Sequence, residues 1–243
     1  MAKRIDDLQY KGFKLVQDSD GFCFGVDAVL LANTAKSARS KKTIDLCSGN
    51  GIVAVLLAAK TSTPEIYALE IQQEACALAR ESVEINDISH RMHVLCDDIK
   101  NVDKLFSRGE FDVVTCNPPY MKNTCGLTNE NDSVKIARHE VACTLDDVIG
   151  AAAYLLKPGG KLFMVHRPER LVDIFCAMRE RKIEPKYMQM VHPCAAKKAN
   201  IVLVEGTYMG GRELKMREPL YVYDENGNYT KQIDEIYERG CEK

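Results

Sequence analysis

From residue 42 onward, short β-rich runs alternate with helical stretches, and this alternation constrains the fold more than any other feature. A strand, a helix and a further strand in succession are typical of right-handed crossovers, which build a parallel sheet covered by helices on both faces. We therefore predict an α/β fold with a mostly parallel sheet and a late antiparallel strand. The predicted strands are residues 43–47, 65–70, 92–96, 111–116, 161–166 and 201–206, and the predicted helices are residues 52–60, 72–86, 101–107, 144–156 and 168–182.

The segments on either side of this alternation have a different character. Residues 1–41 contain a short β-like opening and a predicted helix from Asp27 to Ala35. The carboxylate of Asp27 suits the cap of that helix, because it can accept the unpaired first-turn N–H groups. Residues 215–243 are polar and rich in tyrosine, which predicts a peripheral ribbon and helix. We predict an N-terminal extension (1–41), a core domain (42–214) and this C-terminal appendage (215–243).

A glycine turn follows the first strand of the alternation, in the stretch IDLCSGNGIVAVLLA that begins at Ile44. Ligands of open α/β sheets bind beyond the carboxyl ends of the strands. Gly49 and Gly51 let the backbone turn sharply there and let a ligand come close. The next strand ends on Glu70, whose carboxylate suits both hydroxyls of a ribose. The strand after it delivers Asp97 and Asp98, and either of them suits an adenine amino group.

Two cofactors fit this turn. The spacing Gly49-x-Gly51-x-x-Ala54 satisfies the loose dinucleotide fingerprint. S-adenosylmethionine also fits, because the acidic Asp45 just before the turn would lie near the ammonium of its amino-acid part. The same carboxylate would repel a pyrophosphate, so Asp45 favours S-adenosylmethionine. The alternative without a ligand is that these residues merely shape a turn.

The strand over 111–116 ends in Asn117, Pro118, Pro119 and Tyr120. An amide or aromatic nitrogen is a poor nucleophile because its lone pair is delocalised, unless acceptors hold both of its N–H bonds. The side-chain oxygen of Asn117 and the carbonyl of Pro118 supply two such acceptors, and the proline pair holds them stiffly. Tyr120 offers a flat ring on which a planar base can stack. The alternative is a proline-rich end to the strand with an exposed tyrosine.

Composition excludes several classes of protein. The 243 residues are 46% hydrophobic and 28% charged, with ten cysteines that form no C-x-x-C pair and no regular framework, so we expect neither disulfides nor a metal site. The N-terminus lacks the pattern of a signal peptide, and the longest apolar run is too short for a bilayer. We expect a soluble cytoplasmic protein without a membrane partner. Residues 161–217 carry 12 Lys or Arg against 6 Asp or Glu, which suggests either a face for an anionic partner or ordinary solvated helix faces.

Taken together, the glycine turn, the acidic strand ends and the Asn-Pro-Pro-Tyr motif resemble the class I S-adenosylmethionine-dependent methyltransferases, which have a Rossmann-like fold. The motif resembles the branch that modifies exocyclic amino nitrogens. Longer segments resemble one bacterial family, the tRNA1(Val) (adenine-37-N6)-methyltransferases, over nearly the whole chain. These segments are FCFGVDAVLLAN (22–33), ARHEVACTLDDVIGAAAYLLKPGGKLFMVHRPERL (137–171), KYMQMVHP (186–193) and PLYVYDENGNYTKQIDEIY (219–237).

This resemblance implies methyl transfer from S-adenosylmethionine to N6 of an adenine in tRNA, at position 37 of valine tRNA. The residues matched to the catalytic motif are Asn117, Pro118, Pro119 and Tyr120. Those matched to the cofactor are Asp45, Cys47, Gly49, Asn50, Gly51, Glu70, Ile71, Asp97, Asp98, Ile99 and Asn117. Cys47 departs from the family pattern, because the first glycine of the commoner acidic-x-Gly-x-Gly turn usually stands there.

The RNA-facing residues are predicted from their position and charge. Arg138 and His139 belong to an irregular stretch, residues 121–143, and loops of that length are commonly functional. Lys197 and Lys198 fall in a predicted hairpin loop that would meet a tRNA stem, although solubilising lysines are the alternative. Three rival functions stay open at this point: transfer to a protein glutamine side chain, RNA binding without catalysis, and a nicotinamide oxidoreductase that uses the same glycine turn. The oligomeric state is not indicated by the sequence.

Overall fold

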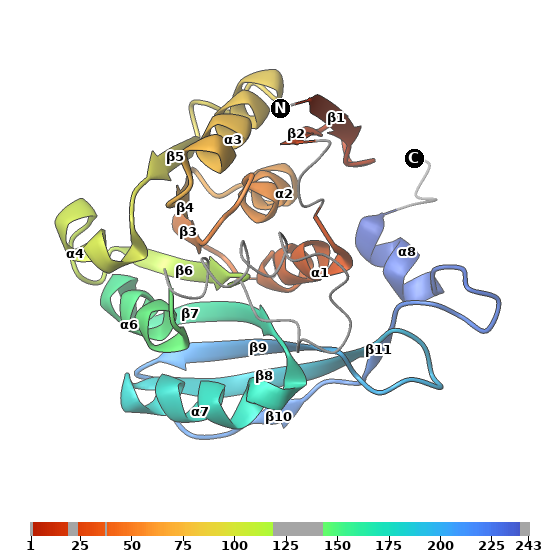
Figure 1. The fold of residues 1–243 in the computed structure, drawn as a ribbon. Helices are drawn as coiled ribbons and strands as arrows, with labels where there is room; N and C mark the ends of the chain where they lie inside the picture. The colour runs from red at the N-terminus through yellow and green to blue at the C-terminus, as the bar shows by residue number, and fades with distance from the viewer. Residues whose placement is uncertain (1, 19–23, 37, 119–142, 239–243) are drawn as a thin grey trace, which may run out of the picture.

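The computed structural model describes residues 2–18, 24–36, 38–118 and 143–238. A long twisted sheet runs through the molecule, and helices cover both of its faces (Figure 1). In chain order, the elements are β1 (Lys3–Asp7), β2 (Lys14–Asp18), α1 (Val26–Ala35), β3 (Lys42–Leu46), α2 (Ile52–Lys60), β4 (Glu65–Glu70), α3 (Gln73–Ile85), β5 (Met92–Cys96), η1 (Ile99–Asn101), α4 (Val102–Leu105), β6 (Phe111–Cys116), α6 (Leu145–Leu155), β7 (Leu156–His166), η2 (Pro168–Arg170), α7 (Leu171–Glu180), β8 (Ile183–His192), β9 (Ile201–Tyr208), β10 (Lys215–Met216), β11 (Leu220–Tyr221) and α8 (Lys231–Tyr237).

The strand order in the large sheet is β10-β8-β9-β7-β6-β3-β4-β5, and β11 also pairs with β8. Strands β7, β6, β3, β4 and β5 are mutually parallel, whereas β9 runs antiparallel between β7 and β8. This confirms the predicted α/β fold with a mostly parallel sheet and a late antiparallel strand. Because β9 is antiparallel to both neighbours, β8 points the same way as β7, and its last residues reach the same edge of the sheet as the ends of β3, β4 and β6.

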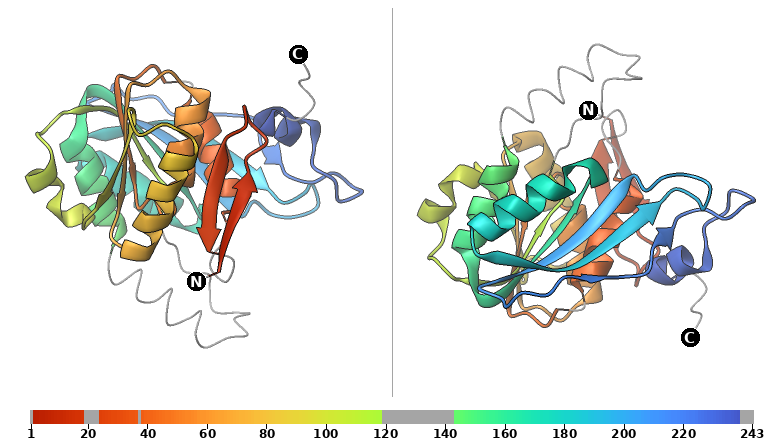
Figure 2. Two further views of the ribbon diagram at one scale, coloured as in Figure 1. Left: turned by 90° about the horizontal axis from the view of Figure 1, so that it is seen from above. Right: turned by 90° about the horizontal axis from the view of Figure 1, so that it is seen from below.

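Two hydrophobic cores lie on opposite faces of the sheet. Helices α1 and α2, with part of α3, pack on one face, and α6 and α7 pack on the other (Figure 2). The strand residues alternate between the cores, as a pleated strand requires. Phe163 and Val165 of β7 belong to the first core, for example, and Leu162 and Met164 belong to the second. Both cores are needed because a parallel sheet buries both of its faces.

The N-terminal and C-terminal segments pack on this framework. The β1–β2 hairpin lies against α3, where the backbone N–H of Val16 donates to the Ser82 hydroxyl (2.9 Å). At the other end of the chain, β10 and β11 join the sheet beside β8, and α8 packs near α1. Residues 215–238 thus contain two short strands that extend the central sheet and one helix. None of the helices in the described part of the chain is long and apolar enough to cross a membrane.

Most predicted elements are confirmed, but β8 was missed. Proline cannot donate to a strand ladder, so Pro185 weakens the sequence signal for a strand over residues 183–192. The structure accommodates it at an irregularity, where the β8–β9 register shifts between Pro185 and Tyr187. Strand β7 begins at Leu156, earlier than the predicted start at residue 161. The prediction is too short because Pro158, Gly159 and Gly160 resemble a turn in sequence.

The helix predictions need smaller corrections. The helix predicted over 101–107 is a 3-10 turn followed by the short α4, and the one predicted over 168–182 is η2 followed by α7. Asp27 does not cap α1: the capping position is Gly25, and Asp27 lies inside the first turn. Its Oδ1 accepts a hydrogen bond from the N–H of Ala28 (3.0 Å).

Gly206 of β9 lies against Met178 of α7 and Ile183 of β8. A Cβ at this position would collide with the Met178 side chain and would come within 2.7 Å of Ile183 Cγ2. We predict that Gly206→Ala lowers the free energy of unfolding by about 1–3 kcal/mol, because both buried neighbours must shift to make room for the added methyl group. Urea denaturation measures this change. Gly211→Ala is the matched control, because a Cβ there would meet nothing within 4 Å; equal stability losses in both variants would contradict the packing argument.

Candidate active site

Three adjacent parallel strands bring the predicted site residues to one edge of the sheet. Leu46 of β3 lies opposite Leu69 of β4 on one side and Cys116 of β6 on the other. The next residues in register are therefore Cys47, Glu70 and Asn117, although they are distant in the chain. Figure 1 shows β4, β3 and β6 side by side. We call this boundary the carboxyl edge.

The turn after β3 needs a left-handed backbone at three positions. The φ angles are +55° at Cys47, +56° at Gly49 and +81° at Gly51. Glycine adopts such angles freely, whereas a side chain at this conformation costs about 1–2 kcal/mol. Cys47 therefore carries strain where the commoner family pattern has a glycine. Gly51, which caps α2, is also needed for packing, because a Cβ there would lie 3.1 Å from the Ala79 Cβ.

Glu70 ties the glycine turn to the end of β4. Its side chain is buried, and Oε2 accepts a hydrogen bond from the N–H of Gly49 (2.8 Å). Its Oε1 accepts from the N–H groups of Ile71 and Gln72 (both 3.0 Å) and from the Gln72 side chain (3.2 Å). Each carboxylate oxygen can accept about two hydrogen bonds. Oε2 therefore retains room for a further donor, such as a hydroxyl group.

Asp45 is buried in β3 below the turn. Its Oδ1 accepts a hydrogen bond from the Thr115 hydroxyl (2.6 Å), whereas Oδ2 and the nearby Ser48 Oγ have no partner among the described residues. Burial raises the pKa of Asp45 to about 7, opposed by the Thr115 hydrogen bond and assisted by the charge of Glu70. Buried polar atoms without a partner are rare in proteins. Two such atoms beside one glycine turn make it a candidate site for a polar ligand that pairs with them.

The acidic residues after β5 already have structural partners. Asp97 Oδ1 accepts from the N–H of Asp98 (2.7 Å) and from the Asn101 side chain (2.8 Å), and the latter bond in particular lowers the pKa of Asp97. Asp98 caps η1 by accepting from the N–H of Lys100 (2.9 Å). Ile99 is buried in the second core, whereas Ile71 is 45% exposed at the carboxyl edge. Of these two isoleucines, Ile71 offers the apolar surface to a ligand.

Asn50 and Asn117 are each linked to the N-terminal extension. The Asn50 side chain donates to Gln17 Oε1 (3.3 Å), which also accepts from the N–H of Phe24 (3.1 Å). The Asn117 side chain donates to Asp27 Oδ2 (3.3 Å). Gln17 and Asp27 are site residues that sequence reasoning missed, because a contact across so many residues leaves no local pattern. Pro119, Tyr120, Arg138 and His139 lie outside the described residues.

Three cysteines meet beneath the turn. Cys47 Sγ lies 3.7 Å from Cys143 Sγ, and Cys116 adjoins Cys47. The hydrogen bond with Cys116 raises the pKa of Cys47 well above its ordinary value. The hydrogen bond with Cys47 raises the pKa of Cys143 in the same way. Burial raises the pKa of Cys116. Thiols react as nucleophiles in the deprotonated form. These three are therefore neutral packing groups at neutral pH.

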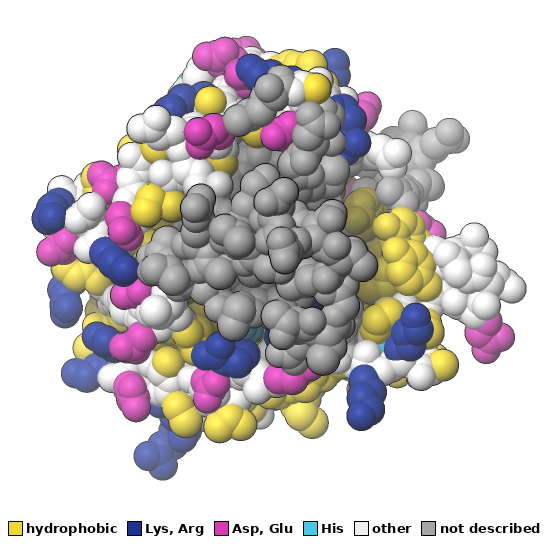
Figure 3. All heavy atoms as spheres, viewed as in Figure 1, with side chains coloured by type: hydrophobic (Ala, Val, Ile, Leu, Met, Phe, Trp, Pro, Cys, Tyr) yellow, Lys and Arg dark blue, Asp and Glu magenta, His cyan; other side chains and the backbone are white. Residues whose placement is uncertain are grey.

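Lys197 and Lys198 lie in the β8–β9 hairpin loop, as predicted, and their side chains are exposed. Neither forms an ion pair with another described residue. The loop stands at the carboxyl edge and joins β8 and β9, which lie three and two positions from β6 in the sheet, or about 9–14 Å at the usual strand spacing. By contrast, much of the remaining positive charge in residues 161–217 is paired: Lys161 and Arg217 both bind the buried Glu205. Figure 3 shows basic and acidic side chains interspersed around the visible rim.

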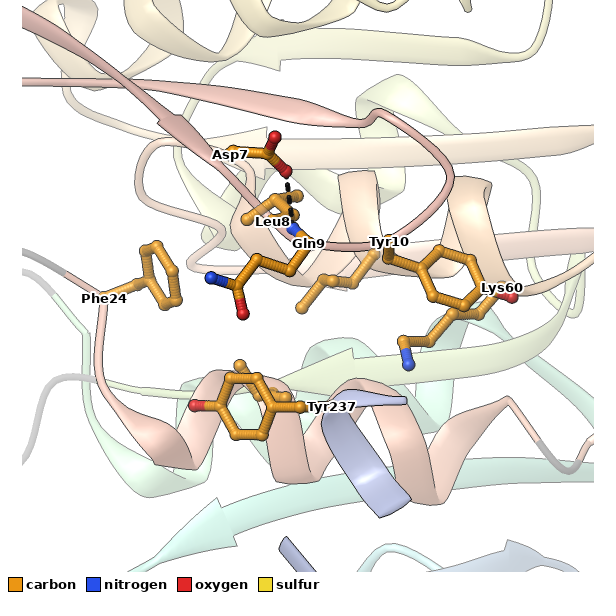
Figure 4. Close-up of a pocket in the computed structure, with 9 residues that line it drawn as sticks. Asp7, Leu8, Gln9, Tyr10, Phe24, Lys60 and Tyr237 are labelled. Atoms are coloured by element: carbon orange, nitrogen blue, oxygen red, sulfur yellow. Dashed lines mark hydrogen bonds between the residues drawn. The ribbon is translucent and has the colours of Figure 1, made fainter. Parts of the chain in front are cut away.

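A separate cavity lies between the β1–β2 turn and α8 (Figure 4). Tyr10, Phe24, Lys60 and Tyr237 are among the residues that line it, and its volume is about 90 Å³. For comparison, an apolar cavity that binds benzene has a volume of about 150 Å³. The cavity is therefore too small for a nucleobase, and it contains none of the predicted site residues. Within the described ranges, no group of three or more His, Cys, Asp or Glu side chains is arranged to hold a metal ion.

The raised pKa of Asp45 predicts a pH-dependent stability. The folded protein keeps a proton on Asp45 up to about pH 7, whereas the unfolded chain releases it near the ordinary value of 3.8. The contribution of Asp45 to the free energy of unfolding therefore falls as pH rises from about 4 to 7, by at most about 1.4 kcal/mol per pH unit. Urea unfolding of wild type and Asp45→Asn at several pH values isolates the effect, because only the wild type carries this titration. If the difference in free energy of unfolding between wild type and Asp45→Asn stays the same from pH 5 to pH 7, the raised pKa of Asp45 is contradicted.

Comparison with known proteins points to one family. The family model of the methyltransferase small domain matches residues 24–181, more than half of the chain. A protein of Parabacteroides distasonis named tRNA1(Val) (adenine(37)-N6)-methyltransferase is 28% identical over 82% of both chains. A protein with the same name from Glaesserella parasuis is 24% identical over 96% of both chains. Another from Shewanella halifaxensis is 30% identical over 63% of this chain and 62% of that one.

Solved structures agree on the fold. A predicted O-methyltransferase of Agrobacterium tumefaciens superposes with a TM-score of 0.72 at 24% identity, over 87% of this chain and 95% of that one. The TYW2 protein of Pyrococcus horikoshii, solved in complex with MeSAdo, gives a TM-score of 0.58 at 15% identity, over 86% and 72% of the two chains. The glycine turn, the strand order and the family match lead to one conclusion: the chain belongs to the methyltransferase small domain family.

Proposed function

We propose that this protein transfers a methyl group from S-adenosylmethionine to N6 of an adenine in tRNA, at position 37 of valine tRNA. The observation that carries this proposal is the place of Asn117, an amide held at the carboxyl end of β6 in register with Glu70 and the glycine turn. The relatives that match over most of their length bear the name of this activity. Such an enzyme acts in the cytoplasm, where tRNA is matured.

The residues of the turn fit S-adenosylmethionine. The unpartnered Asp45 Oδ2 suits the ammonium of its amino-acid part, and Glu70 Oε2 has room for a ribose hydroxyl. The space beside Gly49 is open, since a Cβ there would meet nothing within 4 Å. We assign the remaining contacts to Ile71 and to the Asp97–Ile99 segment. When bound, the cofactor supplies an electrophilic methyl group, and the residues of this chain bind and orient the reactants.

Asn117 and Pro118 hold the amine of the substrate. The Asn117 Oδ1 and the Pro118 carbonyl accept its two N–H bonds, so that the nitrogen lone pair is aimed at the methyl group. Catalysis then rests on alignment, which can contribute many powers of ten in rate. The neutral state of Cys47, Cys116 and Cys143 supports transfer in one step without a covalent intermediate. Stacking of the base on Tyr120, with support from Pro119, is proposed from sequence.

The carboxyl edge near β8 suits single-stranded RNA. Tyr223 is 42% exposed and stacks on Tyr229 (centroids 5.2 Å apart, planes at 13°), which stacks on Tyr237 (5.8 Å, 25°). Figure 3 shows hydrophobic side chains gathered in the region of α8. The N–H of Tyr223 donates to the carbonyl of Pro193, so the stack is fixed to the loop that carries Lys197 and Lys198. Aromatic rings beside cations are how proteins bind unpaired bases and their phosphates.

Asn117→Ala tests the proposed catalytic role. We expect the transfer rate to fall at least 100-fold, because the amine loses the acceptor that fixes its lone pair, while the affinity for S-adenosylmethionine changes less than about threefold. Titration calorimetry measures the affinity, and transfer of labelled methyl to unmodified tRNA measures the rate. Near-normal transfer by this variant would exclude Asn117 as the residue that holds the amine.

Neutralising Lys197 and Lys198 together tests the RNA surface. If both contact phosphates, replacing them with glutamine weakens tRNA binding and lowers the slope of log affinity against log salt by about 1.4. The matched control is Lys182→Gln with Lys186→Gln, which removes the same charge from the opposite end of β8. An equal change of slope in the control, or no change in the test variant, removes this loop from the interface. Arg138 and His139 stay candidates for the same role.

A further inference from the structure

The amide of Asn117 has two ends that differ in chemistry. Its oxygen accepts hydrogen bonds, whereas its nitrogen only donates. Holding a substrate amine requires the oxygen to face the substrate, since an amide NH₂ in that place would oppose the N–H bonds of the amine. A rotation by 180° about the last side-chain bond exchanges the two ends. The site therefore needs a group that decides which end points toward the substrate.

Asp27 is placed to make that decision. Its Oδ2 lies 3.3 Å from Asn117 Nδ2, and its Oδ1 accepts from the N–H of Ala28 in the first turn of α1 (3.0 Å). Since a carboxylate can only accept, the end of the amide that faces it must be the nitrogen. The oxygen of Asn117 is then turned away from Asp27. Asp27 also lies in the first turn of α1, where a helix favours a negative charge.

Gly25 provides the space for this carboxylate. Its backbone is extended (φ −97°, ψ 177°), a conformation that any residue adopts, so the turn itself does not require a glycine. A Cβ on Gly25 would, however, lie 2.6 Å from Asp27 Oδ1. Helix α1 is anchored by its buried residues, which include Ala28, Val29 and Leu30. The backbone under Asp27 is therefore firmly held, and a side chain at position 25 would displace the carboxylate.

We propose that Asp27 is a positioning residue that fixes the productive orientation of the Asn117 amide, and that Gly25 keeps the space for it. This inference rests on the proposed function, because it deepens the role of Asn117 in holding the amine. It assigns a task to the segment before β3, whose residues from 24 onward lie within the family match. Asp27 does not contact the reacting atoms in this account and acts through Asn117.

Exchange of the two functional groups tests the proposal most sharply. Alone, Asp27→Asn should lower kcat, because the introduced amide can also donate and so can bind the Asn117 oxygen. Alone, Asn117→Asp should lower kcat further, since two carboxylates then face each other. Combining the two restores a donor facing an acceptor and leaves a carboxylate oxygen toward the substrate. We expect kcat of the double variant to exceed that of Asn117→Asp at least tenfold, with little change in the Kd for S-adenosylmethionine.

Gly25→Ala supplies a second test that leaves both functional groups in place. It should lower kcat severalfold in the wild-type background and have no further effect in the Asp27→Ala background, where no carboxylate is left to displace. A loss of the same size in both backgrounds would show that Gly25 matters for another reason. Additive losses for Asp27→Asn and Asn117→Asp, in place of the rescue, would overturn the role of Asp27.

A spectroscopic readout separates this inference from the proposed function. The side-chain NH₂ signals of Asn117 in ¹⁵N-labelled protein are assigned by their loss in Asn117→Asp. We expect them to shift in both Asp27→Ala and Gly25→Ala. If they do not shift, the inference fails whether or not the protein is active. If they shift but the wild type transfers no methyl to tRNA, the contact stands and the proposed function fails.

Discussion

Strand β3 pairs in parallel with β4 on one side and with β6 on the other, and the candidate site depends on this double pairing. It places the residues that follow the three strands, Cys47, Glu70 and Asn117, at one edge although they are far apart in the chain. The carboxylate of Glu70 then reaches the backbone of Gly49 and fixes the glycine turn. The N-terminal extension contributes Gln17 and Asp27 from the same side, and each binds an asparagine of the site.

The site works with acceptors and neutral groups more than with strong nucleophiles. Its cysteines are held as thiols, and burial lowers the pKa of His166, at the end of β7, to about 4, so that its ring is uncharged at neutral pH. The His166 Nδ1 lies 2.8 Å from the N–H of Arg167, which donates to it. An enzyme that only has to align an amine with an electrophile needs little more than well-placed oxygen atoms. The buried Asp45 has one oxygen without a partner among the described residues.

Local sequence patterns predict the strands and helices that build the carboxyl edge, but they do not predict contacts between residues that are far apart in the chain. Strands β4, β5 and β6 and helix α2 have the predicted bounds because their apolar residues follow a clear period and end at turn residues. Strand β8 escaped detection because Pro185 is tolerated only at an irregularity that pairing with β9 creates. The sequence suggests Asp27 as a helix cap because its carboxylate suits that task, whereas only the fold brings Asn117 within reach of its Oδ2. Likewise, nothing in the sequence links Asp45 to Thr115.

The central claim is that the edge presents acceptors to an exocyclic amine of adenine. It is tested most directly by the identity of the methylated product. Wild-type protein is incubated with S-adenosylmethionine carrying a labelled methyl group and with unmodified valine tRNA, which is then digested to nucleosides and separated by chromatography before mass spectrometry. The account predicts label in N6-methyladenosine. Label in an isomer methylated on a ring atom of the base, or label in protein glutamine with none in RNA, would contradict it.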